Sequence, residues 1–170
     1  MIPEINDLQS ITIEQVDSLR KTGIAFVKLP DAILEDLKKI EKYGMRYFHQ
    51  PKSFKNLDKF NQYREGYLDQ SEKGYPVERY ITRGVQMSEA LVNCQAEMLN
   101  IREFFKADII LPLVFEVFKQ LNITSHFEVS TKEPDYTLSL IYYPAGELEV
   151  LRLTPHKDTI LMTVVWTQKM

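Results

Sequence analysis

Residues 151–166 read Leu-Arg-Leu-Thr-Pro-His-Lys-Asp-Thr-Ile-Leu-Met-Thr-Val-Val-Trp, and they place His156 two positions before Asp158. Apolar and polar residues alternate ahead of this pair, and a β-branched and aromatic run follows it over 160–166, which is typical of strands. Side chains two positions apart share a face on a strand, whereas on a helix they diverge by about 200°. An extended segment over 151–158 would therefore hold an imidazole and a carboxylate side by side.

One imidazole and one carboxylate are two of the three ligands in the 2-His-1-carboxylate facial triad, which binds non-haem Fe(II) and leaves positions open for a co-substrate and oxygen. The other histidines of the chain, His49 and His126, both precede this segment. We expect His49 at a helix C-terminus, where a cation is favoured, and His126 in a loop or short strand. The third ligand of such a site is left open. An unrelated metal hydrolase, or an ordinary β-domain with a chance His-x-Asp, are alternative interpretations.

A second strand is predicted immediately upstream. Residues 137–143 are rich in β-branched, aromatic and leucine side chains, and they end at the turn residues Pro-Ala-Gly. This order predicts a β-hairpin, with strands over 136–143, 151–158 and 160–166 in one sheet. Alternation places the odd-numbered residues of the first strand on a shared face: Thr137, Ser139, Ile141 and Tyr143.

Helical patterns dominate the earlier part of the chain. Thr12 and Gln15 form a capping-box signature, which predicts a helix over 13–21 that stops at Gly23. Residues 23–30 predict a strand closed by a proline.

Apolar residues at spacings of three and four predict two longer helical regions. One begins at Asp31 and ends near His49, and the other covers 91–121. Pro112 lacks the amide that would bond the carbonyl of Asp108, so we expect a kink or two consecutive helices there. Cys94 lies on the apolar stripe of this second region, which indicates a packed core thiol rather than a nucleophile.

The segment over 54–84 combines aromatic residues and arginines with several glycines, so it predicts short strands and long loops. Such a segment could cover a pocket and contact a substrate. The candidate lining residues are Arg64, Tyr67, Arg79 and Arg83, and Arg64 and Tyr67 are the ones chosen as contacts. The alternative is a tyrosine-rich loop that only packs on the domain.

Length and charge narrow the function classes. A chain of 170 residues suits one domain with a real core, or a large part of a bigger one. The 21 Lys and Arg residues against 24 Asp and Glu residues leave a formal charge of −3, so no global basic field attracts nucleic acid or anionic membrane. No apolar run reaches the roughly 20 residues that span a bilayer, and no secretion signal opens the chain. We expect a cytoplasmic protein with no nucleic-acid and no membrane partner.

Three consecutive stretches resemble the first jelly-roll strands of Fe(II)/2-oxoglutarate-dependent dioxygenases of the isopenicillin N synthase-like group. They are Leu-Ser-Leu-Ile-Tyr-Tyr-Pro at 138–144, Leu-Arg-Leu-Thr-Pro-His-Lys-Asp at 151–158, and Ile-Leu-Met-Thr-Val-Val-Trp at 160–166. The upstream order of strand, helices, Gly-Tyr loop and long helical segment is also similar. The resemblance implies an α+β fold in a single domain. Its expected parts are a helical N-terminal region with short strands over 1–135 and the first strands of a jelly roll, or double-stranded β-helix, over 136–170.

By this resemblance, His156 and Asp158 would be Fe(II) ligands, and Tyr143 would hydrogen-bond the co-substrate 2-oxoglutarate. Arg64 and Tyr67 would be the weaker candidates for contacts to a small-molecule substrate. The implied activity is that of an oxidoreductase that uses molecular oxygen to oxidise that substrate. The alternative is a non-catalytic jelly-roll module that binds a ligand or partner.

The sequence departs from the family at several places. Ile141 stands where many members have Asn, and Ile160 where many have Gly. The second histidine of the family, and an Arg-x-Ser that pairs with 2-oxoglutarate, come several strands after His-x-Asp, yet no residue after His156 is His or Arg. We therefore expect a jelly roll that is incomplete at its C-terminus, in a fragment or truncated form that binds Fe(II) weakly and is inactive by itself.

Overall fold

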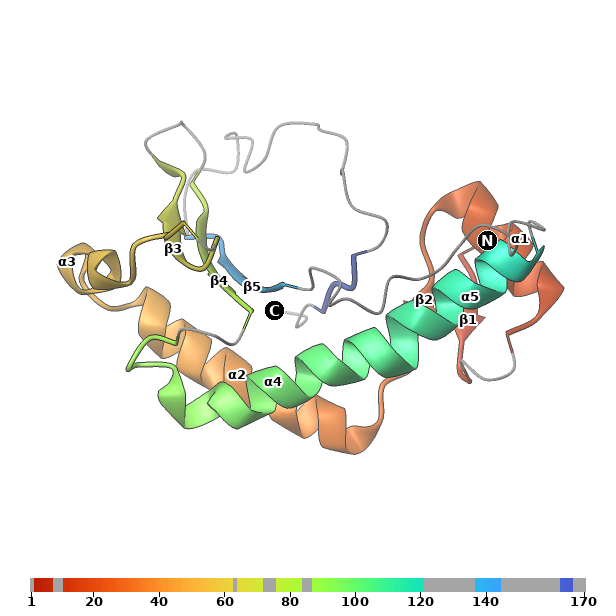
Figure 1. The fold of residues 1–170 in the computed structure, drawn as a ribbon, viewed down its shortest axis with the longest axis horizontal. Coiled ribbons are helices and arrows are strands. Elements are labelled where there is room, and N and C mark those ends of the chain that lie inside the picture. The colour runs from red at the N-terminus through yellow and green to blue at the C-terminus, as the bar shows by residue number, and fades with distance from the viewer. Residues whose placement is uncertain are drawn as a thin grey trace. The chain divides into compact units, whose positions relative to one another are not determined.

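The computed structural model describes residues 2–7, 11–62, 64–71, 76–83, 87–120, 137–144 and 163–166 (Figure 1). Helices and short strands are both present among them, which confirms the predicted α+β class. In the part of the chain that is described, no helix is long and apolar enough to cross a membrane. The chain divides into two compact units. The first unit comprises the described residues within 1–34, 103–135 and 162–170. The second unit comprises the described residues within 35–102 and 136–161.

The first unit contains a helix that the sequence predicts closely. Helix α1 (Ile13–Thr22) lies between β1 (Glu4–Ile5) and β2 (Phe26–Val27), which pair in parallel. The Thr12 hydroxyl accepts from the Gln15 amide at 3.2 Å, and Gln15 Oε1 accepts from the Thr12 amide at 2.9 Å. Gly23 ends the helix at φ +69°. The capping box and the glycine stop are confirmed, whereas the strand predicted over 23–30 is only two residues long.

The second helical region of the sequence contains a change of helix type. Helices α4 (Gln95–Phe104) and α5 (Leu111–Gln120) are joined by the π-helical segment η4 (Phe105–Ile110). The amide of Leu111 donates to the carbonyl of Lys106, five residues back. The wide turn comes just before Pro112, which cannot donate to Asp108, so the prediction of consecutive helices at this proline agrees with the structure.

The core of the first unit forms around Ile5, Ile109 and Leu113, and Val164 packs against it. The described residues 163–166 are not in a strand, so the strand predicted over 160–166 is wrong for this portion. Their burial nevertheless alternates, with Val164 and Trp166 half-buried. Alternating apolar residues are also found in an extended segment that packs one side against a core without pairing with another strand.

The second unit is built on a three-stranded antiparallel sheet of order β3-β4-β5 (Figure 1). Its strands are β3 (Gly66–Asp69), β4 (Glu78–Thr82) and β5 (Leu138–Tyr142). Helix α3 (Lys52–Lys55) and the 3-10 helix η1 (Asn56–Asp58) precede the sheet. The short strands predicted within 54–84 and the strand predicted over 136–143 are confirmed. Strand β5 pairs with β4, and the expected partner strand over 151–158 lies outside the described residues.

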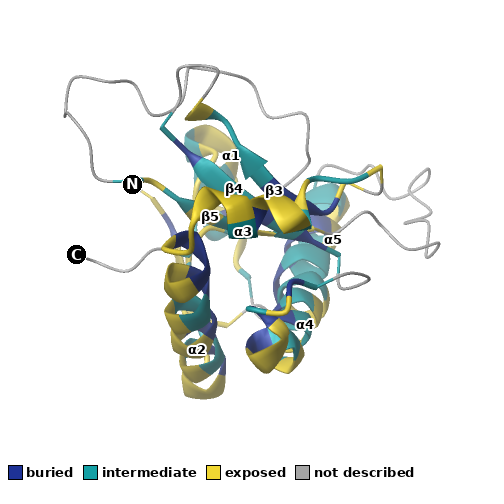
Figure 2. Cartoon of the chain, turned by 90° about the vertical axis from the view of Figure 1, so that its left-hand side faces the viewer, coloured by how far each residue is buried: buried dark blue, intermediate teal, exposed yellow. Residues whose placement is uncertain are grey.

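Helix α2 (Asp31–Phe48) covers one face of this sheet. Phe48 stacks on Tyr142 of β5 with ring centroids 5.3 Å apart, and Tyr47 meets Tyr80 of β4 edge-on at 5.1 Å. A Cβ on Gly44 would lie 3.4 Å from Leu140 Cδ1, so this glycine permits close contact between helix and sheet. Buried residues accordingly lie on β3, on β4 and along α2 (Figure 2).

The opposite face of the sheet is here called the outer face. Register places Leu68 and Ile141 beside Arg79, and Ser139 beside Ile81. Along β5 the odd-numbered residues are exposed and the even-numbered ones half-buried, and the alternation continues to Tyr143. The predicted shared face of Thr137, Ser139, Ile141 and Tyr143 is therefore confirmed, and it is the outer face.

Candidate functional site

The structure describes only some of the predicted site residues. His156, Asp158 and His126 lie outside the described residues. Tyr143 follows β5 directly on the outer face, and the residue is 43% exposed. Within the described ranges, no three His, Cys, Asp or Glu side chains gather closely enough to hold a metal ion.

His49 lies at the end of α2, on the helix side of the sheet. Its Nδ1 is 2.7 Å from the carbonyl oxygen of Met45, and because a carbonyl only accepts, Nδ1 carries the proton and donates. The His49 ring is 5.6 Å from that of Tyr142, which faces α2, whereas Tyr143 faces outward. The predicted position at a helix C-terminus is confirmed, and the sheet separates His49 from Tyr143.

The two substrate candidates take different positions. Arg64 is exposed in a tight turn at φ +61°, where its amide donates to the carbonyl of Asn61 at 3.0 Å. Tyr67 is 3% exposed on the face toward α2, and its hydroxyl donates to Glu78 Oε2 at 2.8 Å. The Tyr67 ring and hydroxyl are thus both engaged inside the protein, on the opposite face from Tyr143.

A buried ion pair that no sequence motif predicts lies beside Tyr67. Lys55 is 5% exposed, pairs with Glu78, and donates to the carbonyl of Phe48 at 2.9 Å. Its Nζ is also 5.3 Å from the centre of the Tyr67 ring, within the range of a cation–π contact. Burial, with the Glu78 carboxylate close by, raises the pKa of the Tyr67 hydroxyl far above its usual value. The cluster thus links the end of α2 to β3 and β4.

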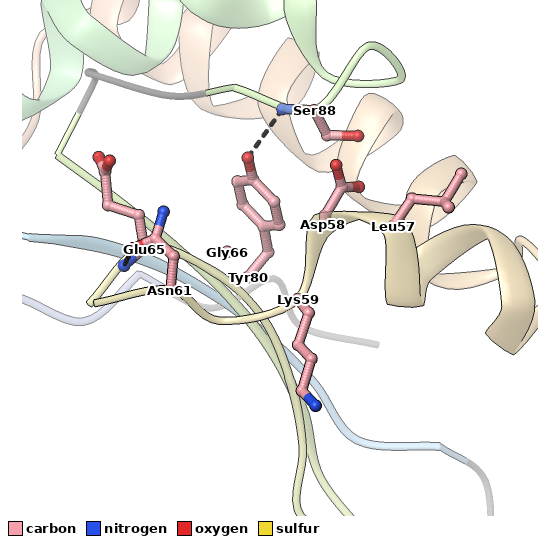
Figure 3. A pocket seen from close by; sticks show the side chains of 8 residues that line it. All are labelled: Leu57, Asp58, Lys59, Asn61, Glu65, Gly66, Tyr80 and Ser88. Atoms are coloured by element: carbon pink, nitrogen blue, oxygen red, sulfur yellow. Dashed lines mark hydrogen bonds between the residues drawn. The ribbon is translucent and has the colours of Figure 1, made fainter. Parts of the chain in front are cut away.

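A small cavity of about 50 Å³ lies near this cluster (Figure 3). Tyr80 stands between Glu65 and Asn61 on one side and Asp58 on the other, and its hydroxyl accepts from the Ser88 amide at 2.8 Å. Burial raises the pKa of Tyr80 to about 12, helped by the nearby charges of Asp58 and Glu65. The volume suits a few water molecules and is far below the roughly 300 Å³ or more of a ligand pocket. This cavity is therefore too small for 2-oxoglutarate. It is lined by Leu57, Asp58, Lys59, Asn61, Glu65, Gly66, Tyr80 and Ser88.

Cys94 has the predicted role of a core thiol. It ends the 3-10 helix η3 (Val92–Cys94), is fully buried, and its Sγ donates to the carbonyl of Leu91 at 3.2 Å. Burial raises the pKa of the thiol to about 11, so the reactive thiolate is scarce near neutral pH.

Asp69 should make the free energy of unfolding depend on pH in the acidic range. Burial alone would raise its pKa, but hydrogen bonds from Ser71 and Lys52 outweigh it and lower the pKa to about 2. A lowered carboxyl pKa stabilises the fold above the unfolded-state value, and that stabilisation is lost as pH falls from about 4 to about 2. Because Lys52 is exposed, we expect a loss on the order of 1 kcal/mol. Urea unfolding at pH 5, 3 and 2 should show this loss in the wild type and a smaller one in Asp69→Asn. Equal pH dependence in both proteins would contradict the assignment.

Comparison of the chain with protein-family models, with curated proteins and with solved structures found no match.

Proposed function

We propose that this chain forms part of a non-haem Fe(II)/2-oxoglutarate-dependent oxygenase acting on a small molecule, and that His156 and Asp158 are two of its iron ligands. The observation that supports the proposal most is the outer face of β5. The strand predicted to open a jelly roll is present, one of its faces is covered by α2, and Tyr143 is exposed on the other face. That is the side on which a jelly roll would enclose its ligands.

The residues of this face suit a polar co-substrate in an apolar setting. Tyr143 has a phenol that can donate a hydrogen bond to a carboxylate or keto oxygen. Ile141 and Leu68 lie on the same face and supply apolar contact area. When bound, Fe(II) supplies the oxygen activation that protein side chains cannot provide. The contribution of the chain is to hold the metal through one imidazole and one carboxylate and to orient the co-substrate through Tyr143.

Fe(II) titration under anaerobic conditions tests the ligand assignment. We expect His156→Ala to weaken binding by about ten-fold or more, because outer-shell losses alone typically cost 10- to 100-fold in metal affinity. Asp158→Asn should have a similar effect. His49→Ala is the matched control, since it removes an imidazole that is bonded to Met45 and lies on the helix side of the sheet. A loss in His49→Ala as large as in His156→Ala would refute the assignment.

A further inference from the structure

We infer that the outer face of the sheet binds the carboxylate of an organic acid through Arg79. This inference rests on the proposed function and names the chemistry that this face recognises, which is the carboxylate of a small organic acid. It is carried by the position of Arg79 in the sheet, by the distribution of charge over the two sheet faces, and by the apolar residues around the guanidinium.

Strand register brings Arg79 and Tyr143 to the same surface. Arg79 lies directly opposite Ile141, and residues opposite one another in an antiparallel pair share a face. Tyr143 is two positions beyond Ile141 on that face, which makes it the diagonal neighbour of Arg79 at roughly 7–8 Å between backbones. Both side chains are long enough to reach one carboxylate between them. Arg79 offers a fork of N–H donors and Tyr143 an O–H.

The charges of the sheet are separated by face. Its two strand carboxylates, Asp69 and Glu78, lie on the face toward α2, and they pair there with Lys52 and Lys55. The strand residues of the outer face, by contrast, include no acidic side chain among those described. They are Gly66, Leu68, Arg79, Ile81, Ser139 and Ile141.

Arg79 is consequently a cation without an internal counter-ion in the described structure. Its Nε is shielded from solvent and has no hydrogen-bond partner among the described residues. A buried donor that lacks an acceptor is costly, and a bound anion would supply that acceptor. Guanidinium groups prefer carboxylates and phosphates because two parallel N–H donors match two oxygens. The surrounding Leu68, Ile81 and Ile141 favour an apolar carbon chain next to the charge, which an organic acid has and inorganic phosphate lacks.

The carboxylate can belong to the substrate or to 2-oxoglutarate, and the choice of probes separates these sources. Hexanoate represents an apolar monocarboxylate, 2-oxoglutarate the polar diacid, and hexanamide the same chain as hexanoate without charge. Binding is measured by NMR titration of Ile141 and Tyr143, with EDTA present so that no metal contributes. We expect hexanoate to shift both residues and hexanamide to have no effect. Tighter binding of 2-oxoglutarate than of hexanoate would assign the carboxylate to the co-substrate, and the reverse order would assign it to the substrate.

Variants of the guanidinium make the test specific. Arg79→Gln should weaken acid binding by about ten-fold or more. Arg79→Lys keeps the charge but loses the paired N–H donors of the guanidinium, so its affinity for the acid should lie between those of Arg79→Gln and the wild type. Arg46→Gln removes an equal charge from α2, where Arg46 lies over Tyr43, and should leave binding unchanged. Thermal unfolding confirms that each variant is folded, and Arg79→Lys serves if Arg79→Gln does not fold.

The inference is overturned if Arg79→Lys and the wild type bind the acids equally, or if hexanamide binds as tightly as hexanoate. Its outcome is separable from that of the iron site. His156→Ala should bind the acids normally in EDTA, so a failure of the metal titration and a failure of the acid titration point to different residues.

Discussion

Replacing Lys55 with alanine should lower the free energy of unfolding by about 3–5 kcal/mol. The substitution leaves the Glu78 carboxylate, whose side chain is 17% exposed, without its cation, and the carbonyl of Phe48 without its donor. Removing one partner of a buried ion pair is strongly destabilising, because the other charge then stays buried without compensation. Urea unfolding followed by circular dichroism measures it.

Lys52→Ala is the matched control for this result. Lys52 is also a lysine paired with a carboxylate of the same sheet, Asp69 at 2.9 Å, but its side chain is 53% exposed. A solvated pair contributes about 1 kcal/mol or less, so the two lysines should differ by several-fold in effect. Comparable losses in Lys52→Ala and Lys55→Ala would show that burial of the Lys55–Glu78 pair does not determine its energetics.

Gly66→Ala should be the second strongly destabilising change, with a loss of about 2–5 kcal/mol. Gly66 has φ +111°, a conformation that L-residues with a side chain rarely adopt, and an added Cβ would lie 2.3 Å from the carbonyl oxygen of Asp58. Backbone strain and steric overlap therefore act together. The affected backbone connects η1 to β3, where the Phe60 amide donates to the carbonyl of Tyr67 at 3.0 Å.

Gly23→Ala separates the two causes. Gly23 also has a positive φ, +69°, but no atom lies within 4 Å of an added Cβ. Only the cost of the left-handed conformation applies there, about 1–2 kcal/mol. Thermal unfolding should rank the wild type above Gly23→Ala and Gly23→Ala above Gly66→Ala. If Gly23→Ala is the less stable variant, the steric argument for Gly66 is wrong.

The features that the sequence predicted well are local ones. The capping box at Thr12 and Gln15 and the stop at Gly23 need only neighbouring residues, and all are present. The alternation along β5 likewise assigns Tyr143 to a face without knowledge of the partner strand. Such signals lie within a few consecutive residues, so they do not depend on contacts with distant parts of the chain.

The features that could not be predicted depend on contacts between distant segments. Lys55 and Glu78 are 23 residues apart with no spacing rule to connect them, and β5 pairs with β4 across more than fifty residues. The burial of Tyr67 could not be predicted from the sequence either, because tyrosine occurs both in the interior with a hydrogen-bond partner and on exposed contact surfaces. Arg79 was one of four candidate lining residues within 54–84, and only the strand register showed which residues share its face.

Paramagnetic broadening by Mn²⁺ is the most direct measurement of the central claim, that His156 and Asp158 hold a metal beside Tyr143. Mn²⁺ stands in for Fe(II) and broadens the NMR signals of nuclei close to it. If the claim holds, signals of His156, Asp158 and Tyr143 broaden at the lowest Mn²⁺ concentrations and those of His49 and Cys94 only at higher ones, and His156→Ala abolishes this order. Broadening centred on His49, or the same pattern in His156→Ala as in the wild type, would contradict it.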